Sequence, residues 1–300
     1  MINKAVQFVF FANYFVGLLA VMLAIETCVQ LQLPLSSPAF YTFLFFATVL
    51  YYTWAYILPP AASATNPRTA WYKTHARYVV STQILFIIII AIALCVLAVE
   101  NFNRLHFFNI YDWIILVSIP LTGILYYGLL PRSILNRNLR NTGWIKPFVI
   151  GYVWAGWICF LPAMMAKMEG SVQLNSTFML WLFIKNWMFC TVNAIMFDIK
   201  DYADDSNKQL KTFVVRFGLR KTIFVILIPL LSIGVISFLI FAVQNHFSLP
   251  RIIFNLIPFA CLLYVSLSLQ QRKSILYYLV VIDGLLLIKA VCGICGIIFR

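Results

Sequence analysis

Long apolar stretches alternate with short polar connections along the whole chain. Nine stretches follow one another, each close to the roughly 20 apolar residues that an α-helix needs to cross a bilayer. The connections leave no room for an extramembrane domain, so we expect one integral membrane domain over 1–300. The pattern predicts an all-α polytopic membrane protein with nine transmembrane helices. They are placed at 5–27, 38–58, 78–99, 112–130, 144–166, 176–197, 223–243, 251–270 and 275–298.

Composition supports a membrane protein and changes how the net charge is interpreted. The chain is 63% hydrophobic and 10% charged, whereas soluble domains carry about 25% charged residues. Its formal charge of +13 would in a soluble protein suggest nucleic acid. Cytoplasmic loops of polytopic proteins collect Lys and Arg, which explains the excess. Since no nucleic-acid-binding motif accompanies the charge, we expect membrane lipid and no nucleic acid as a partner.

The positions of the basic residues predict how the bundle is oriented. Sixteen of the 22 Lys and Arg fall at one set of helix ends and four at the other, while Lys185 and Lys289 lie inside predicted helices. The positive-inside rule then puts the N-terminus in the cytoplasm and the C-terminus outside. The main cytoplasmic connections are expected at about 59–77, 131–143 and 198–222, in a protein of the bacterial inner (cytoplasmic) membrane.

Acidic residues gather at the end of the sixth predicted helix. Four of the nine in the chain lie between Asp198 and Asp205. In a helix Asp198, Asp201 and Asp205 share one face, with Asp204 on a neighbouring stripe. Grouped carboxylates repel one another unless a cation joins them, and oxygen ligands suit magnesium, which completes its shell with waters and substrate phosphate. The cluster therefore predicts a phosphate-handling site at a membrane surface.

The sequence around this cluster resembles a known family motif. DIKDYADDSNKQLKTFVVRFG, from Asp198 to Gly218, is similar to the second aspartate-rich motif of UbiA-type intramembrane prenyltransferases. Asp198, Asp201 and Asp205 match its acids, and Phe217 and Gly218 match its end. The nine predicted helices also resemble that family, so the likeness extends over nearly the whole chain. It implies a UbiA-like bundle.

The resemblance also implies an activity and its residues. Members of the family move a prenyl group from a polyprenyl diphosphate to a lipophilic acceptor and depend on Mg²⁺. Asp198 and Asp201 are then the expected catalytic residues, and Asp198, Asp201 and Asp205 the expected metal ligands. Basic residues suited to phosphate contacts and expected to bind the diphosphate are Lys208, Lys211, Arg68, Arg137 and Arg140.

The first aspartate-rich motif of the family has no counterpart. The sequence that commonly follows it survives as Asn66-Pro67-Arg68-Thr69, and counting back places the expected Asn and acids at Ala55, Tyr56, Pro59 and Ser63 or their neighbours. No Asp or Glu lies between Glu26 and Glu100. Either cations replace the missing metal ion, or the protein does not ionise a diphosphate.

The acids Asp283 and Glu26 fall within predicted helices. Asp283, in the last helix, is expected to face the bundle interior with a partner, since acids within the membrane seldom stand alone. Lys289 is on a different face, so Lys185 or a backbone amide is an equal candidate. Glu26 is near the outer end of its helix, where we expect it to be exposed.

Three functions remain open on this pattern. A Mg²⁺-dependent prenyltransferase is favoured by the complete second motif. A protein of the same fold that binds an isoprenoid or another lipid, or acts as an assembly partner, is favoured by the loss of the first motif. A transporter would predict inverted repeats and broken helices at mid-membrane, and the sequence has no convincing internal repeat.

Overall fold

Helices make up nearly all of the structure. A computed structural model describes residues 4–57, 67–127, 143–168, 175–207, 209–271 and 273–299, and these residues form no β-strand. The helices are α1 (Lys4–Phe11), α2 (Tyr14–Leu31), α3 (Pro38–Ile57), α4 (Pro67–Thr74), α5 (Ala76–Asn101), α6 (Ile110–Tyr127), α7 (Lys146–Ala155), α8 (Leu161–Met168), α9 (Ser176–Lys200), α10 (Tyr202–Asn207), α11 (Phe213–Phe217), α12 (Leu219–Lys221), α13 (Ile228–Gln244), α14 (Leu249–Ser268), α15 (Ile275–Tyr277) and α16 (Asp283–Ile298).

Within the described residues, seven helical stretches are long and apolar enough to cross a membrane. The protein is therefore an integral, multi-pass membrane protein. The expected segments at 38–58 and 112–130 coincide with α3 and α6. Neither belongs to the seven, and most of α6 is a shorter apolar helix, Ile110–Tyr126. The count of nine spans and the orientation of the termini remain predictions.

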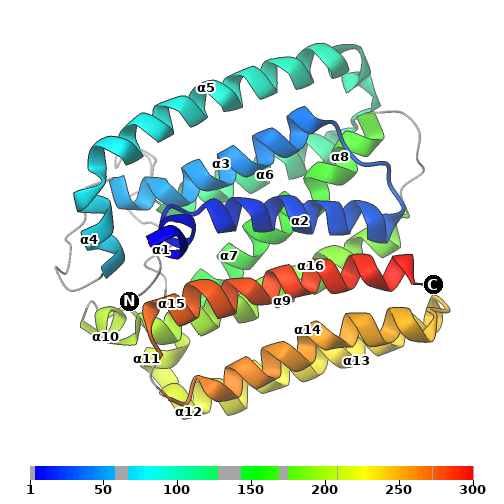
Figure 1. Ribbon diagram of the computed structural model, residues 1–300. Helices are drawn as coiled ribbons and strands as arrows, with labels where there is room; N and C mark the ends of the chain where they lie inside the picture. The colour runs from blue at the N-terminus through cyan, green and yellow to red at the C-terminus, as the bar shows by residue number, and fades with distance from the viewer. Residues whose placement is uncertain are drawn as a thin grey trace.

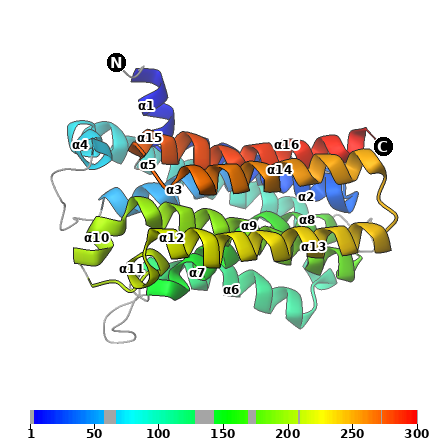
Figure 2. The ribbon, with the colours of Figure 1, turned by 90° about the horizontal axis from the view of Figure 1, so that it is seen from below.

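The long helices run side by side and give the bundle two distinct ends (Figures 1 and 2). One end carries the short helices α4, α10 and α11, and is called the α10 end below. The last residues of α16 lie at the opposite, C-terminal end. Helix α7 packs on α9, α3 on α5, and α16 on both α2 and α14. These contacts bury a continuous apolar core between the helices. This packing fixes how the helices lie relative to one another at both ends of the bundle.

Several predicted helices are interrupted. The expected segment 5–27 is divided into α1 and α2, because Asn13 adopts a left-handed backbone conformation with φ of 66°. The span that contains α7 and α8 continues between them through a π-helical turn, Gly156–Phe160. A second π-helical turn, Tyr278–Ile282, precedes α16. Such turns redirect the side chains that follow them, here Asp283.

The expectation that Glu26 is exposed is wrong. Its side chain is 1% exposed, and Oε2 accepts a hydrogen bond from Lys289 Nζ at 2.6 Å. Gln30 and Arg251 extend this buried polar group: Gln30 donates to the Gly293 carbonyl at 3.0 Å, and Arg251 donates to Gln30 Oε1 at 3.1 Å. Helix α16 packs on α2, and an acid near a helix end is buried when another helix covers that end.

Candidate functional site

The acidic cluster lies at the α10 end, where α9 ends and α10 begins. Asp198 is still within α9 and its side chain is 2% exposed, while Asp205, in α10, is 6% exposed. Asp201, between the two helices, is 37% exposed and pairs with Lys200 at 3.1 Å. Asp198 interacts electrostatically with both Asp201 and Asp205. Because α9 ends at Lys200, the three carboxylates do not share the face of one continuous helix, but they still lie near one another.

Lys146 also belongs to this group. The sequence shows it only as one of the sixteen basic residues at the predicted cytoplasmic helix ends. Lys146 Nζ donates to Asp198 Oδ1 at 2.6 Å, and its side chain is 14% exposed. Lys146 also interacts electrostatically with Asp205 and with Tyr126. The other oxygen, Asp198 Oδ2, is buried and has no hydrogen-bond partner among the described residues. No motif marks Lys146, because only the packing of α7 on α9 places it there.

Two contacts fix the start of α7 against α9 and the chain after α10. Gly143 has φ of +66°, and a Cβ atom there would stand 2.5 Å from the backbone oxygen of Lys211. Only glycine fits this turn without displacing that backbone. Trp187 Nε1 donates to the Phe148 carbonyl at 2.9 Å, which ties α7 to α9. Lys146, between these two contacts, is held beside Asp198.

The other predicted diphosphate-binding residues fall in different places. Lys208, Arg137 and Arg140 lie outside the described residues. Lys211 is exposed, and its backbone contacts Gly143. Lys211 is thus far from Lys146 in sequence but close in space to the turn that leads into it. Its predicted role remains a prediction.

Arg68 fastens α4 to the break between α1 and α2. It is 6% exposed and donates from Nε to the Phe11 carbonyl at 3.2 Å, and from Nη2 to the same carbonyl at 3.0 Å and to Asn13 Oδ1. Its guanidinium lies 4.5 Å from the ring centroid of Tyr56, which stacks on Tyr72. Tyr56 is a position where the resemblance expects an acid. These contacts favour a structural role for Arg68, and diphosphate binding by it stays a prediction.

Asp283 also faces this end of the bundle. It interacts electrostatically with Arg68 and Lys200. The two lysines considered as partners are used elsewhere: Lys185 donates to Asn255 Oδ1 at 2.7 Å, and Lys289 pairs with Glu26. The charged neighbours of Asp283 are therefore at the α10 end and belong to other helices.

An apolar pocket adjoins the charged group. Its volume is about 440 Å³, within the range of about 300–1,000 Å³ typical of ligand pockets. Tyr126 lines the pocket and interacts with Lys146, and Val149, one helical turn after Lys146, lines it too. The remaining lining residues are Ala47, Thr48, Leu50, Tyr51, Tyr52, Trp54, Ile90, Ile119, Pro120, Gly123, Ile124, Ile150, Val153, Trp154 and Trp157. The apolar pocket and the charged group therefore meet at Tyr126.

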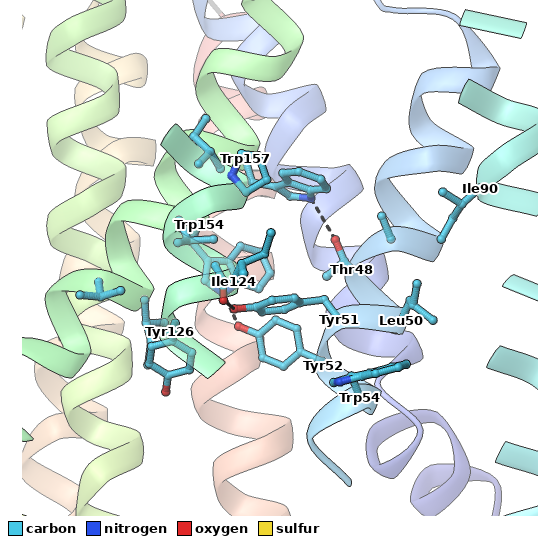
Figure 3. A pocket seen from close by; sticks show the side chains of 17 residues that line it. Thr48, Leu50, Tyr51, Tyr52, Trp54, Ile90, Ile124, Tyr126, Trp154 and Trp157 are labelled. Atoms are coloured by element: carbon cyan, nitrogen blue, oxygen red, sulfur yellow. Dashed lines mark hydrogen bonds between the residues drawn. The ribbon is translucent and has the colours of Figure 1, made fainter. Parts of the chain in front are cut away.

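Aromatic side chains from two sides of the pocket hold one another in place. Figure 3 shows Trp154 and Trp157 directed toward Tyr52 and Thr48 of α3. Trp157 Nε1 donates to Thr48 Oγ1 at 3.1 Å, Trp154 Nε1 donates to Tyr52 Oη, and Tyr51 Oη donates to the Gly123 carbonyl at 3.1 Å. Because these polar atoms satisfy one another, the ring faces form a fixed, largely apolar wall.

The carboxylates suit one hard divalent ion with an incomplete protein shell. Asp198 Oδ2 is a buried oxygen without a hydrogen-bond partner in the described part of the chain, as a metal ligand awaiting its ion would be. Over the same residues no group of three acidic, His or Cys side chains lies close enough to hold a metal alone. Magnesium is commonly bound by one or two carboxylates together with water and phosphate. Asp198, with Asp201 and Asp205 nearby, fits such a site.

Fold and site together define an integral membrane protein with a cluster of carboxylates and a lysine at one end and an apolar pocket beside it. The chain belongs to the UbiA prenyltransferase family, whose model matches residues 62–277. UbiA prenyltransferases are generally metal-dependent.

A solved structure described as a study of digeranylgeranylglyceryl phosphate synthase in membranes has a similar fold. It is 14% identical, each chain is covered over 100% of its length, and the TM-score is 0.56. At this identity the likeness concerns the fold. A comparison with curated protein sequences found no match.

Proposed function

We propose that the protein transfers a prenyl group from a polyprenyl diphosphate to a lipophilic acceptor, with Mg²⁺ at Asp198. The observation that carries this proposal is the meeting of the charged group with the apolar pocket at Tyr126 and Lys146. A prenyl diphosphate has the same two parts, an anionic head and an apolar chain. The head fits beside Asp198, and the chain fits along the aromatic wall.

In this reaction the bond between the allylic carbon and the diphosphate oxygen breaks, and its electron pair leaves with the diphosphate. The acceptor forms the new bond to that carbon and releases a proton. A bound divalent ion would stabilise the charge that develops on the leaving group by several kcal/mol. Lys146 adds positive charge at the same place. The ring faces of Tyr52 and Trp154 stabilise positive charge on the allylic carbon, and the apolar wall excludes water from it.

The decisive experiment measures diphosphate release by the purified protein in detergent or nanodiscs, with polyprenyl diphosphates of several chain lengths and Mg²⁺. We expect Asp198→Asn to lower release at least about 100-fold, since the carboxylate holds the ion that stabilises the leaving group. Asp112→Asn is the matched control, because Asp112 pairs with Lys167, which lies at the opposite end from Lys146 of the span Gly143–Met168. Equal release by wild type and Asp198→Asn would remove Asp198 from the mechanism.

A second function is supported by one specific observation. The absence of any acid between Glu26 and Glu100 removes the family's first metal half-site, which favours a protein that binds an isoprenoid lipid without transferring it. The two functions separate in the same assay. A transferase both binds the donor and releases diphosphate, whereas a lipid-binding protein binds the donor and releases none with any acceptor.

A further inference from the structure

The ammonium group of Lys146 places a positive charge of the protein itself at the acidic cluster, in addition to any bound metal ion. Its ammonium group is 2.6 Å from Asp198 Oδ1 and interacts with Asp205 as well. An ammonium group has three N–H donors, and the hydrogen bond to Asp198 is the one that Lys146 Nζ makes within the described residues. With respect to the described part of the chain, its other donors are therefore available to an anion at the same place.

Asp198 and Lys146 differ in exposure, and this difference suits ligand binding. Asp198 is almost fully enclosed, at 2% exposed, while Lys146 is 14% exposed and adjoins the pocket-lining residue Tyr126. Lysine is a compact charge on a flexible stem of four carbons. The ammonium group can therefore turn from Asp198 toward an anion beside the pocket with little movement of α7.

We propose that Lys146 is a diphosphate-binding residue, which exchanges Asp198 Oδ1 for a diphosphate oxygen when the donor binds. The proposal rests on the proposed function, because it concerns the same anionic head. In the resting protein Lys146 neutralises part of the charge of Asp198 and Asp205. In the complex its charge faces the diphosphate, and Asp198 is left with both oxygens for a divalent ion.

This exchange compensates for the charge that is missing because the first aspartate-rich motif has no counterpart. A diphosphate carries about three negative charges near neutral pH, and one divalent ion neutralises only part of them. Lys146 supplies a further positive charge without a second metal site. Lys146 also competes with a metal ion for Asp198, so its removal has opposite effects on the two ligands.

The experiment compares wild type with Lys146→Met in nanodiscs by two binding measurements that do not need turnover. The first is the affinity for geranylgeranyl diphosphate in the presence of EDTA. The second is the affinity for Mn²⁺ alone, followed by electron paramagnetic resonance. We expect metal-free donor affinity to fall about 10-fold, which corresponds to about 1.4 kcal/mol. Mn²⁺ affinity should rise several-fold, because Asp198 Oδ1 is released from its ion pair.

Lys167→Met is the matched control. Lys167 also pairs with an aspartate, Asp112, and stands at the other end of the same membrane span. It should change neither affinity, and Lys146→Arg should retain most of the metal-free donor affinity. Unchanged donor affinity and unchanged Mn²⁺ affinity in Lys146→Met would overturn the proposal. Absence of diphosphate release by wild type would overturn the transferase function and leave this binding result standing.

If Lys146→Met does not fold, a double variant tests the proposal instead. Lys146→Met combined with Asp198→Asn removes both charges and is compared with Asp198→Asn alone. The proposal requires weaker metal-free donor binding by the double variant. Equal binding would overturn it.

Discussion

The chain contains two lysine–carboxylate pairs of the same length that differ in their surroundings. Lys146–Asp198 and Lys289–Glu26 are both 2.6 Å long. The second pair is closed on every side: its side chains are 2% and 1% exposed, and Glu26 Oε1 lies against the backbone of α16 at Gly293, where a Cβ atom would approach it to 2.4 Å. No ligand fits between them.

The first pair is open toward one side. Lys146 is 14% exposed and lies beside the pocket-lining residue Tyr126. The second carboxylate oxygen has no hydrogen-bond partner among the described residues in either pair, so the exposure of the lysine is what distinguishes them. Burying charges costs several kcal/mol, and their attraction repays this cost only with good geometry. The enclosed pair therefore serves to hold α2 and α16 together, whereas the open pair is available to a ligand. The following predictions test this difference, from the largest effect to the smallest.

The enclosed pair should be the more sensitive to loss of one partner. Lys289→Met leaves Glu26 charged and uncompensated, and we expect a loss of about 3–5 kcal/mol in the free energy of unfolding. Thermal unfolding in detergent, with the fraction of monodisperse protein, measures it. The double variant Glu26→Gln/Lys289→Met should recover most of the stability. A loss below about 1 kcal/mol in the single variant would show that this pair is not enclosed.

Gly293 tests how tightly the enclosed pair is packed. Gly293→Ala would place a methyl group 2.4 Å from Glu26 Oε1, and we expect it to cost about 1–3 kcal/mol. Gly284→Ala, on the same helix, is the control, since nothing lies within 4 Å of its Cβ position. That control should be neutral or stabilising by up to about 1 kcal/mol, because alanine is the better helix former. Equal unfolding temperatures for both variants would contradict the packing argument.

The open pair should contribute less to stability. Lys146→Met removes the partner of Asp198, but the Lys146 side chain is 14% exposed, so this pair is less enclosed than Lys289–Glu26. We expect a loss of about 2 kcal/mol, clearly smaller than for Lys289→Met. Unfolding of both variants side by side measures the difference. A loss equal to that of Lys289→Met would mean that Lys146 is mainly structural.

A smaller effect is expected for the half-buried pair Lys167–Asp112. Its side chains are 27% and 17% exposed, and ion pairs that water reaches contribute about 1 kcal/mol at most. Lys167→Met should therefore shift the unfolding temperature only slightly, and added salt should reduce the shift further. A shift comparable to that of Lys146→Met would remove the distinction between the open pair and the half-buried pair.

Part of the site was predictable because its residues are neighbours in sequence. Asp198, Asp201 and Asp205 lie within eight residues of one another, so they stay close together although α9 ends at Lys200 and α10 begins at Tyr202. Lys146 is 52 residues away from Asp198 and lies among other basic residues near a membrane surface, which positive-inside counting already explains. Glu26 and Lys289 are 263 residues apart. No local pattern links residues that meet only when helices pack.

The amino-acid sequence by itself determined that this is a helical membrane protein with an acidic cluster at one helix end. The reason is that lipid requires every backbone hydrogen bond to close within a segment, so long apolar runs become helices. The tertiary structure decided which lysine meets which carboxylate, that Arg68 binds the Phe11 carbonyl, and that a cavity opens beside Tyr126. These outcomes depend on how closely helices approach one another, which glycines such as Gly143 and Gly293 control through their lack of a side chain.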